Sequence, residues 1–327
     1  LKNILDKGNS ENADPRSYEV LNRILEHREL AKIKSTYIDA LPSMVNKSTG
    51  RVHTSYRQTG TTTGRISSND PNVQNIPVRT ELGRKVREAF VTENPDEDVL
   101  LAADYSQIEL RVLAHLSKDS ELVNAFHRGE DIHSATSSMV YDIPIDEVTP
   151  DMRRVAKVLN FGVIYGLSPH GIARITVLSQ KEGKEFIDIY FNKYPGILNY
   201  LEGIKSQCHT SGYIETLLGR RRYLPEINSR NFHLRSQAER AAINMPIQGT
   251  AADIIKIAMI NIDEQLKVLE MESKMILQVH DELIFEVPRQ ELQQLESLVG
   301  ELMPSAVILD VPLEIEMKTG PDWGNLR

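Results

Sequence analysis

Two aspartates, Asp104 and Asp281, stand where the hydrophobic pattern predicts the ends of buried strands. Asp104 follows the apolar run 99–103, and Asp281 lies at the tip of a hairpin predicted over residues 274–287. A lone aspartate at such a place is commonly a turn residue, but carboxylates beside apolar elements are costly unless they bind a cation. Two carboxylates about 4 Å apart repel by roughly 4 kcal/mol at an effective dielectric near 20. A pair of Mg²⁺ ions would remove that repulsion and could promote an in-line phosphoryl displacement.

A second pattern lies on a helix predicted over residues 150–166, with Thr149 as its N-cap, Pro150 at its first position and Gly166 at its end. Two cations and two aromatic rings recur at every fourth residue along it: Arg153, Lys157, Phe161 and Tyr165. This spacing places them on one face. A nucleoside triphosphate along that face would meet cations at its phosphates and rings at its base and sugar. The alternative is an amphipathic helix whose rings pack in a core and whose cations face water.

Polar residues with the same spacing occur on a second helix, predicted over residues 234–269 and interrupted at Pro246. They are Arg240, Asn244 and Gln248. These residue types can hydrogen-bond the acceptors that all base pairs present in the minor groove, although a structural role explains each of them equally well. His133 could contact phosphate, and here too a structural role is the alternative.

The elements that must position these residues indicate an α+β fold. Helices are predicted over 16–41, 108–116, most of 119–230 and 234–269, and strands over 99–103, the two halves of 274–287, and 311–317. Residues 51–75 are rich in Thr, Ser, Gly and Asn and read as an extended loop with short strands. Strands before and after a helical stretch predict a sheet interrupted by a helical subdomain. Residues 1–15 show little pattern, as expected if the chain begins inside a larger domain.

Composition is that of a folded, water-soluble protein. The chain has 327 residues, 40% hydrophobic and 26% charged, which predicts about two domains and excludes collagen-like and disordered classes. Its apolar runs are far shorter than the roughly 20 residues of a membrane span, so we expect a cytoplasmic protein without a membrane partner. The single cysteine, Cys208, excludes an internal disulfide and a zinc site built on a cysteine pair.

Charge is segregated along the chain. The net charge is −8, yet residues 79–87, 151–157 and 220–240 carry +3, +2 and +4, which leaves −17 on the remainder. A basic groove on an acidic body would suit an anionic polymer. The alternative is that these windows are ordinary solvated faces.

Three segments resemble motifs A, B and C of the family A DNA polymerases. They are DYSQIELR at 104–111, RRVAKVLNFGVIYG at 153–166 and QVHDEL at 278–283. TGRISSNDPNVQNIPVR at 63–79 and AERAAINMPIQGTAADIIK at 238–256 support the resemblance, which runs in order from about residue 16 to the end.

The resemblance implies a right-hand polymerase fold, in which an antiparallel palm sheet is interrupted by a helical fingers subdomain. The implied domains are the base of a thumb (1–45), the first part of the palm (46–118), the fingers (119–231) and the second part of the palm (232–327). Only the base of a thumb fits before residue 41. The chain therefore resembles a piece of a longer polymerase, without most of the thumb and without N-terminal nuclease domains.

The resemblance also implies roles for individual residues. Two Mg²⁺ ions, with Mn²⁺ as a substitute, would be held by Asp104, Asp281 and the backbone carbonyl of Tyr105. The dNTP would be bound by Arg153, Lys157, Phe161, Tyr165, His133, Glu109 and Gln107. Lys157 would protonate the leaving pyrophosphate, and Glu109 would exclude a 2′-hydroxyl. The primer and minor groove would be contacted by Arg65, Arg240, Asn244, Gln248 and His280, with Glu282 as a secondary carboxylate. Phenylalanine at 161 implies discrimination against dideoxynucleotides.

The activity implied is template-directed transfer of a deoxynucleotide from a dNTP to a primer 3′-OH, with release of pyrophosphate. Its partners would be primer-template DNA and dNTPs, and the enzyme would be a monomer associated with the nucleoid. Two alternatives are a noncatalytic nucleic-acid-binding module and a single-subunit RNA polymerase of related fold, which Glu109 disfavours.

Overall fold

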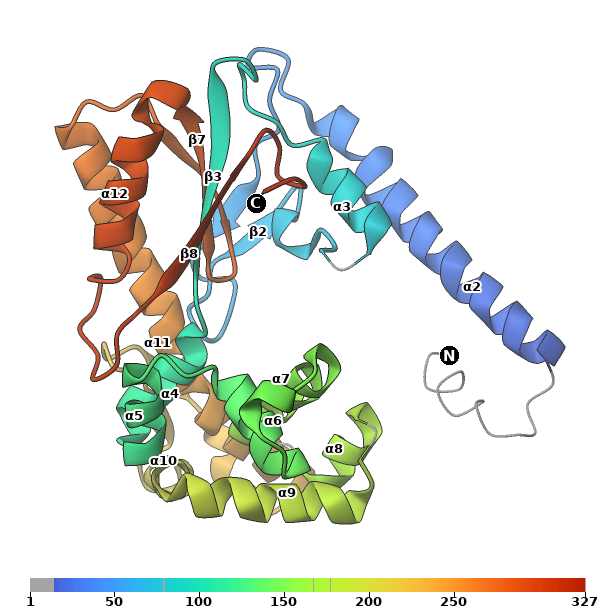
Figure 1. Cartoon of the computed structure of the whole chain (residues 1–327), viewed down its shortest axis with the longest axis vertical. Coiled ribbons are helices and arrows are strands. Elements are labelled where there is room, and N and C mark those ends of the chain that lie inside the picture. Colours follow the sequence, from blue (N-terminus) through green and yellow to red (C-terminus); the bar gives the residue numbers. More distant parts are fainter. Residues whose placement is uncertain (1–14, 79, 167, 177, 327) are drawn as a thin grey trace. The chain divides into compact units, whose positions relative to one another are not determined.

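The computed structural model describes residues 15–78, 80–166, 168–176 and 178–326, and it has the predicted α+β character (Figure 1). The helices are α2 (Pro15–Ile33), α3 (Glu81–Glu88), α4 (Ile108–Ser117), α5 (Ser120–His127), α6 (Ile132–Tyr141), α7 (Pro150–Ile164), α8 (Pro169–Ile175), α9 (Gln180–Lys193), α10 (Pro195–Ser211), α11 (Phe232–Val268) and α12 (Leu292–Leu302). The strands are β1 (Ser55–Arg57), β2 (Ser67–Asn69), β3 (Asp98–Tyr105), β4 (Tyr213–Glu215), β5 (Arg221–Tyr223), β6 (Lys274–Val279), β7 (Glu282–Pro288) and β8 (Ile315–Gly320). No helix in this described part of the chain is long and apolar enough to cross a bilayer.

The chain forms two compact units. The first contains Leu1–Arg57, Ser67–Leu101 and Lys318–Arg327, and the second contains Gln58–Ile66 and Ala102–Met317. In the first unit, the ring of Trp323 lies edge-on to Phe90, with centroids 5.5 Å apart, and the guanidinium of Arg87 lies 4.0 Å from the Trp323 ring centre. Such ring contacts give this unit a small core of its own.

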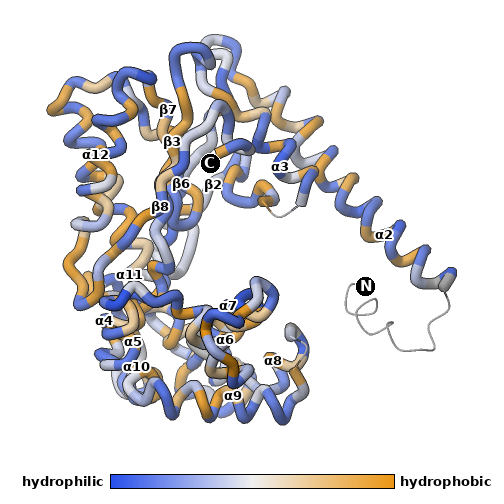
Figure 2. The backbone as a smooth tube through the Cα atoms, in the orientation of Figure 1, coloured by the Kyte–Doolittle hydropathy of each residue, from blue (hydrophilic) through white to orange (hydrophobic). Residues whose placement is uncertain are grey.

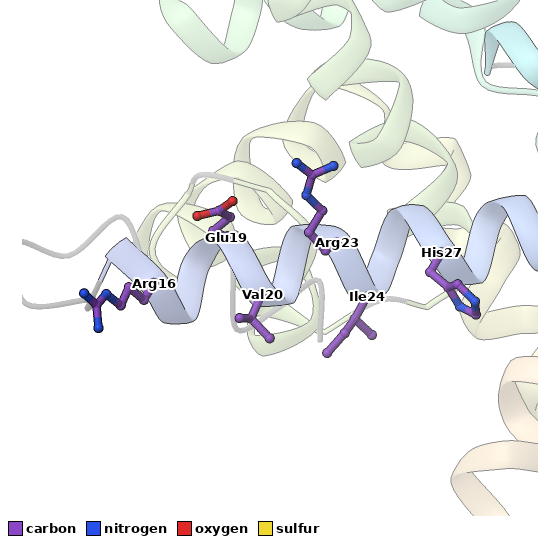
Figure 3. Close-up of a pocket in the computed structure, with 6 residues that line it drawn as sticks. All are labelled: Arg16, Glu19, Val20, Arg23, Ile24 and His27. Atoms are coloured by element: carbon purple, nitrogen blue, oxygen red, sulfur yellow. The ribbon is translucent and has the colours of Figure 1, made fainter.

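Helix α2 of the first unit exposes much of its surface. Figure 2 shows hydrophobic and hydrophilic residues alternating along it. Val20 and Ile24 are 56% and 41% exposed, and they line an open pocket on the helix surface together with charged neighbours (Figure 3). The full lining is Arg16, Glu19, Val20, Arg23, Ile24 and His27.

A four-stranded sheet with the order β6-β7-β3-β8 carries both predicted aspartates. Strand β3 is formed by an apolar run in which residues 99–103 are buried. Strands β6 and β7 pair antiparallel with Val279 opposite Glu282, so His280 and Asp281 form a two-residue turn. His280 has a φ of +57°, the left-handed conformation that such tight turns require. The predicted strand and hairpin are therefore present, whereas β8 begins at Ile315, later than the expected residue 311.

Helices make up most of the second unit. Helix α7 packs against α6, and α11 packs against α10, α4 and α12. Thr149 caps α7, because its Oγ1 accepts a hydrogen bond from the Met152 N–H at 3.3 Å, and Gly166 follows α7 with a φ of +70°. Both features agree with the prediction from sequence.

One expectation about α11 is wrong. The helix continues through Pro246 without the predicted interruption. Proline removes one helical hydrogen bond, but Met245, Pro246 and Ile247 are all buried, so packing on several sides holds the helix together here. The sequence showed little pattern over residues 1–15. Of these, residues 1–14 lie outside the described residues.

Candidate active site

The structure brings together Asp104, on β3, and Asp281, in the turn between β6 and β7. The backbone N–H of Tyr105 donates a hydrogen bond to the Asp281 carbonyl oxygen, with N and O 3.2 Å apart. Asp104 is exposed and Asp281 is half-buried. Two residues separated by 177 positions in the sequence thus become neighbours because β3 lies beside β7 in the sheet.

The electrostatics of this pair favour a bound cation. Burial raises the pKa of Asp281, the guanidinium of Arg65 lowers it, and the charge of Asp104 raises it again. The structure therefore holds a carboxylate whose ionised form is disfavoured by burial and by its neighbour. A divalent cation between the two side chains would stabilise both ionised forms.

Glu109 of α4 links this pair to two further predicted residues. The residue is only 9% exposed. Its Oε1 accepts a hydrogen bond from Arg65 Nη2 at 2.6 Å, and its Oε2 accepts one from the Tyr165 hydroxyl. Burial raises the pKa of Glu109, while the hydrogen bond from Tyr165 and the charge of Arg65 lower it. Glu109 is therefore held in one position by two donors.

The four residues predicted to share one face of α7 have different surroundings. Arg153 forms an ion pair with Asp131, at 2.7 Å between Nη2 and Oδ2, and Lys157 is exposed. The rings of Phe161 and Tyr165 are stacked, with centroids 6.2 Å apart and an interplanar angle of 25°. Both rings are half-buried. The cations and rings thus lie along a surface that a ligand could still contact.

His133 lies beside this face, with its ring centroid 5.9 Å from that of Phe161, and it is 2% exposed. Asn160 Nδ2 donates to His133 Nδ1 at 3.0 Å, and Asn160 Oδ1 accepts from Thr136 Oγ1 at 3.0 Å. The proton of the neutral ring therefore lies on Nε2. Burial lowers the pKa of His133 to about 4, helped by the charge of Arg153 and opposed by that of Asp131.

The predicted polar residues of α11 lie beside the end of α7. The side chain of Gln248 makes a hydrogen bond with the Tyr165 hydroxyl. Arg240 Nη1 donates to Ser236 Oγ at 2.7 Å, and a Cβ at Gly166 would lie 3.4 Å from Arg240 Cγ. Asn244 Oδ1 is buried and, among the described residues, has no hydrogen-bond donor. This acceptor is a polar group for which a ligand could supply the partner.

The remaining predicted residues flank the two aspartates. The Tyr105 hydroxyl donates to the Met303 carbonyl at 2.6 Å, so its side chain points into the protein. Gln107 has a φ of +53°, and its buried Oε1 lacks a donor within the described ranges. His280 is exposed in the hairpin turn, and Glu282 is half-buried at the start of β7.

The donor set limits which metal the site could hold. The described residues contain no group of three or more His, Cys, Asp and Glu side chains placed to bind one ion. The carboxylates of Asp104 and Asp281 are the predicted metal-binding groups that the structure brings close together. Mg²⁺ commonly uses one or two carboxylates and completes its octahedron with waters and substrate phosphates. The residues present fit an ion of this kind.

Several residues that the sequence did not single out support the site. They are Asp131 and Asn160, described above, and Thr136, Arg220, Asp253 and Lys256. The only local signal was for Asp131, which caps α6 by accepting from the backbone N–H groups of His133 and Ser134. Asp253 and Lys256 lie three positions apart on α11, but the other contacts of these residues join segments far apart in the sequence.

Comparison with known proteins identifies the family. The model of DNA polymerase family A matches residues 5–325. The chain is 50% identical to DNA polymerase I of Geobacillus stearothermophilus over 306 residues, which is 94% of this chain and 35% of that protein. It is 49% identical to DNA polymerase I of Bacillus subtilis over 306 residues, again 94% of this chain and 35% of that protein.

A solved structure is similar over nearly the whole chain. It is the POL domain of Pol1 from M. smegmatis in complex with DNA primer-template and dNTP. The TM-score is 0.93 at 46% identity, and the match covers 99% of this chain and 56% of that one. The chain belongs to DNA polymerase family A. It spans about a third of the length of the DNA polymerase I relatives that it matches.

Proposed function

We propose that this chain catalyses template-directed addition of deoxynucleotides to the 3′-OH of a DNA primer, with release of pyrophosphate. The observation that carries the proposal is the hydrogen bond from the Tyr105 N–H to the Asp281 carbonyl, which makes Asp104 and Asp281 neighbours. The similar Pol1 domain was solved with primer-template and dNTP. Its similarity to this chain supports the same partners here.

The proposed subdomains follow the right-hand arrangement of a palm and fingers. Residues 46–118 and 232–327 would form the palm, since they include the sheet strands β3, β6, β7 and β8. Residues 119–231 would form the fingers, which contain α5 to α10. Residues 1–45 would form the base of a thumb.

Asp104, Asp281 and the Tyr105 carbonyl would hold two Mg²⁺ ions. When bound, such ions lower the pKa of an attacking hydroxyl and stabilise the charge of the leaving group. Burial and the charge of Asp104 both disfavour the ionised form of Asp281. Bound cations would offset both effects, which supports this assignment.

Side chains on and beside α7 would bind the triphosphate. Arg153 and Lys157 would contact phosphate oxygens, and Lys157 would donate a proton to the leaving pyrophosphate. His133 would donate its Nε2 hydrogen, the position that the Asn160 hydrogen bond leaves protonated. Phe161 would contact the nucleotide, and the Tyr165 ring is stacked against the Phe161 ring.

Glu109 would select the sugar. Arg65 and Tyr165 hold its two oxygens, so the carboxylate cannot turn away from a 2′-hydroxyl without losing a charge-assisted hydrogen bond. Gln107, adjacent to the same helix, would lie at the nucleotide. On the DNA side, the primer and minor groove would be contacted by Arg65, Arg240, Asn244, Gln248 and His280, with Glu282 as a secondary carboxylate.

Single-nucleotide primer extension with Mg²⁺ tests the proposal. We expect Asp281→Asn to lower the rate by at least about 100-fold, because several kcal/mol of charge stabilisation would be lost. Asp263→Asn is the matched control, since Asp263 is exposed on α11 and pairs only with Lys267 in the described structure. Undiminished extension by Asp281→Asn would show that the two-metal assignment is wrong.

A further inference from the structure

Arg65 lies in an irregular loop, residues 58–66, between β1 and β2. Its guanidinium must nevertheless be held in place, because it contacts Glu109 and lowers the pKa of Asp281. Within the loop, the Thr61 hydroxyl donates to the Arg65 carbonyl at 2.7 Å. One local hydrogen bond does not fix such a segment relative to α4, so its position must depend on other elements.

Helix α11 holds the loop directly. Lys256 Nζ donates a hydrogen bond to the Gly64 carbonyl at 2.8 Å, one residue before Arg65. The close approach of helix and loop is also visible at Gly249, where a Cβ would lie 3.1 Å from the Thr63 carbonyl oxygen. Burial lowers the pKa of Lys256, and the charge of Asp253 raises it. The lysine is thus partly removed from water to make this contact.

The loop is also approached closely by Arg220, which precedes β5. A Cβ at Gly64 would lie 2.5 Å from Arg220 Nε, so only a glycine leaves room for that side chain. Gly64 also has a φ of +82°, a conformation that disfavours other residues. Arg220 and Lys256 therefore enclose the Gly64 backbone between the β4–β5 hairpin and α11.

A buried carboxylate fixes both cations. Asp253 is 6% exposed, and its Oδ1 accepts from Arg220 Nε at 2.9 Å and Nη2 at 2.7 Å. Lys256 Nζ lies 3.5 Å from the same oxygen, and the Thr216 hydroxyl donates to Oδ2 at 2.9 Å. Every oxygen of this carboxylate is occupied, as a buried charge requires. We call Arg220, Asp253 and Lys256 the Asp253 anchor.

We propose that the Asp253 anchor is a positioning device for Arg65. It holds the Gly64 carbonyl, and through the peptide backbone it sets where the Arg65 guanidinium meets Glu109. The anchor residues themselves contact neither of the two aspartates in the described structure. The effect on catalysis rests on the proposed polymerase function, whereas the effect on the loop does not.

A double-mutant cycle in primer extension tests the coupling. We expect Lys256→Met to lower kcat/KM for nucleotide addition by about 10-fold to 100-fold, since small displacements of positioned groups cost this much. In the Arg65→Ala background the same change should cost less than about 2-fold, because its effect passes through Arg65. Lys256→Arg keeps a donor and should restore most of the activity. Lys267→Met, an exposed lysine of the same helix, is the control.

If the effects of Lys256→Met and Arg65→Ala multiply, the two residues act independently and the proposal is wrong. If Lys256 had only a structural role, Lys256→Met would lower the unfolding temperature equally in the wild-type and Arg65→Ala backgrounds. It would then not cost more activity in the wild-type background than in the Arg65→Ala background. Gly64→Ala provides a second variant. It should also lower kcat/KM, and its effect should likewise become smaller in the Arg65→Ala background. Gly212→Ala is its control, because Gly212 has a similar φ of +75° but no atom within 4 Å of its Cβ position.

Amide hydrogen exchange separates failure of the anchor from failure of the proposed function. We expect Lys256→Met to increase exchange in residues 58–66 by at least about 10-fold, while Lys267→Met leaves it unchanged. This readout needs no activity. Unchanged exchange in this loop would overturn the proposal even if the wild-type chain extends primers, and increased exchange would support it even if the chain does not.

Discussion

At the scale of single residues, His133 combines near-complete burial with a hydrogen bond that leaves its Nε2 protonated. Its pKa of about 4 in the folded chain is below the usual 6.5. Between these values the unfolded chain binds more protons than the folded one, so stability is lost as the pH falls through this window. The loss amounts to roughly 3 kcal/mol at most.

We therefore expect His133→Gln to reduce the fall in unfolding free energy between pH 6.5 and pH 4. Urea denaturation at the two pH values measures the difference for each variant. His127→Gln is the control, because His127 is exposed and bonds only the Asp310 carbonyl among its described contacts. An equal fall for wild type and His133→Gln would show that His133 is not the group responsible.

A second prediction at this scale concerns the sugar of the incoming nucleotide. The apolar ring of Phe161 is stacked on the ring of Tyr165. We expect Phe161→Tyr to increase the use of dideoxynucleotides relative to deoxynucleotides by about 10-fold, since a hydrogen bond to a charged group is worth roughly 1.5–3 kcal/mol. The measurement is the ratio of kcat/KM for the two substrates. Phe232→Tyr, at an exposed ring, should leave the ratio unchanged.

Individual polar contacts show where sequence reasoning reached its limit. The four-residue spacing on α7 was enough to predict which residues share a face. It could not show that Arg153 pairs with Asp131 or that Asn160 bonds His133, because those contacts join α7 to α6. Asp253 was equally hidden, since two of its partners, Thr216 and Arg220, come from the β4–β5 hairpin and lie more than 30 positions away, and only Lys256 is near in the sequence.

At the scale of elements, the start of α7 depends on Thr149. Its hydroxyl accepts the Met152 N–H, and loss of such a cap costs about 1 kcal/mol. We expect Thr149→Ala to lower the free energy of unfolding by this amount and Thr149→Ser to retain most of it. Denaturant titration measures both. Equal stability of the alanine and serine variants would mean that the cap contributes nothing.

The strands were predictable because their signals are local. An apolar run ending in Asp104 and a hairpin around His280 and Asp281 follow from hydrophobic alternation and turn geometry. The unbroken course of α11 was not predictable, since proline at 246 signals a break. Burial of that face against neighbouring helices outweighs the missing hydrogen bond, and this packing is a tertiary property.

At the scale of the whole chain, charge segregation should govern DNA binding. Basic windows on an acidic chain predict an affinity that falls steeply with salt. We expect Arg240→Ala to reduce the slope of log Kd against log salt concentration by about one, as for the loss of one phosphate contact. Lys267→Ala should leave the slope unchanged. An unaltered slope for Arg240→Ala would show that Arg240 does not contact a DNA phosphate.

In the order β6-β7-β3-β8, Asp104 lies on the inner strand β3, and Asp281 lies in the turn that directly precedes the other inner strand, β7. Inner strands are the last part of a protein to open, so their amides exchange only when the whole structure melts. Heating should therefore leave the carboxylate pair intact until the sheet itself is lost.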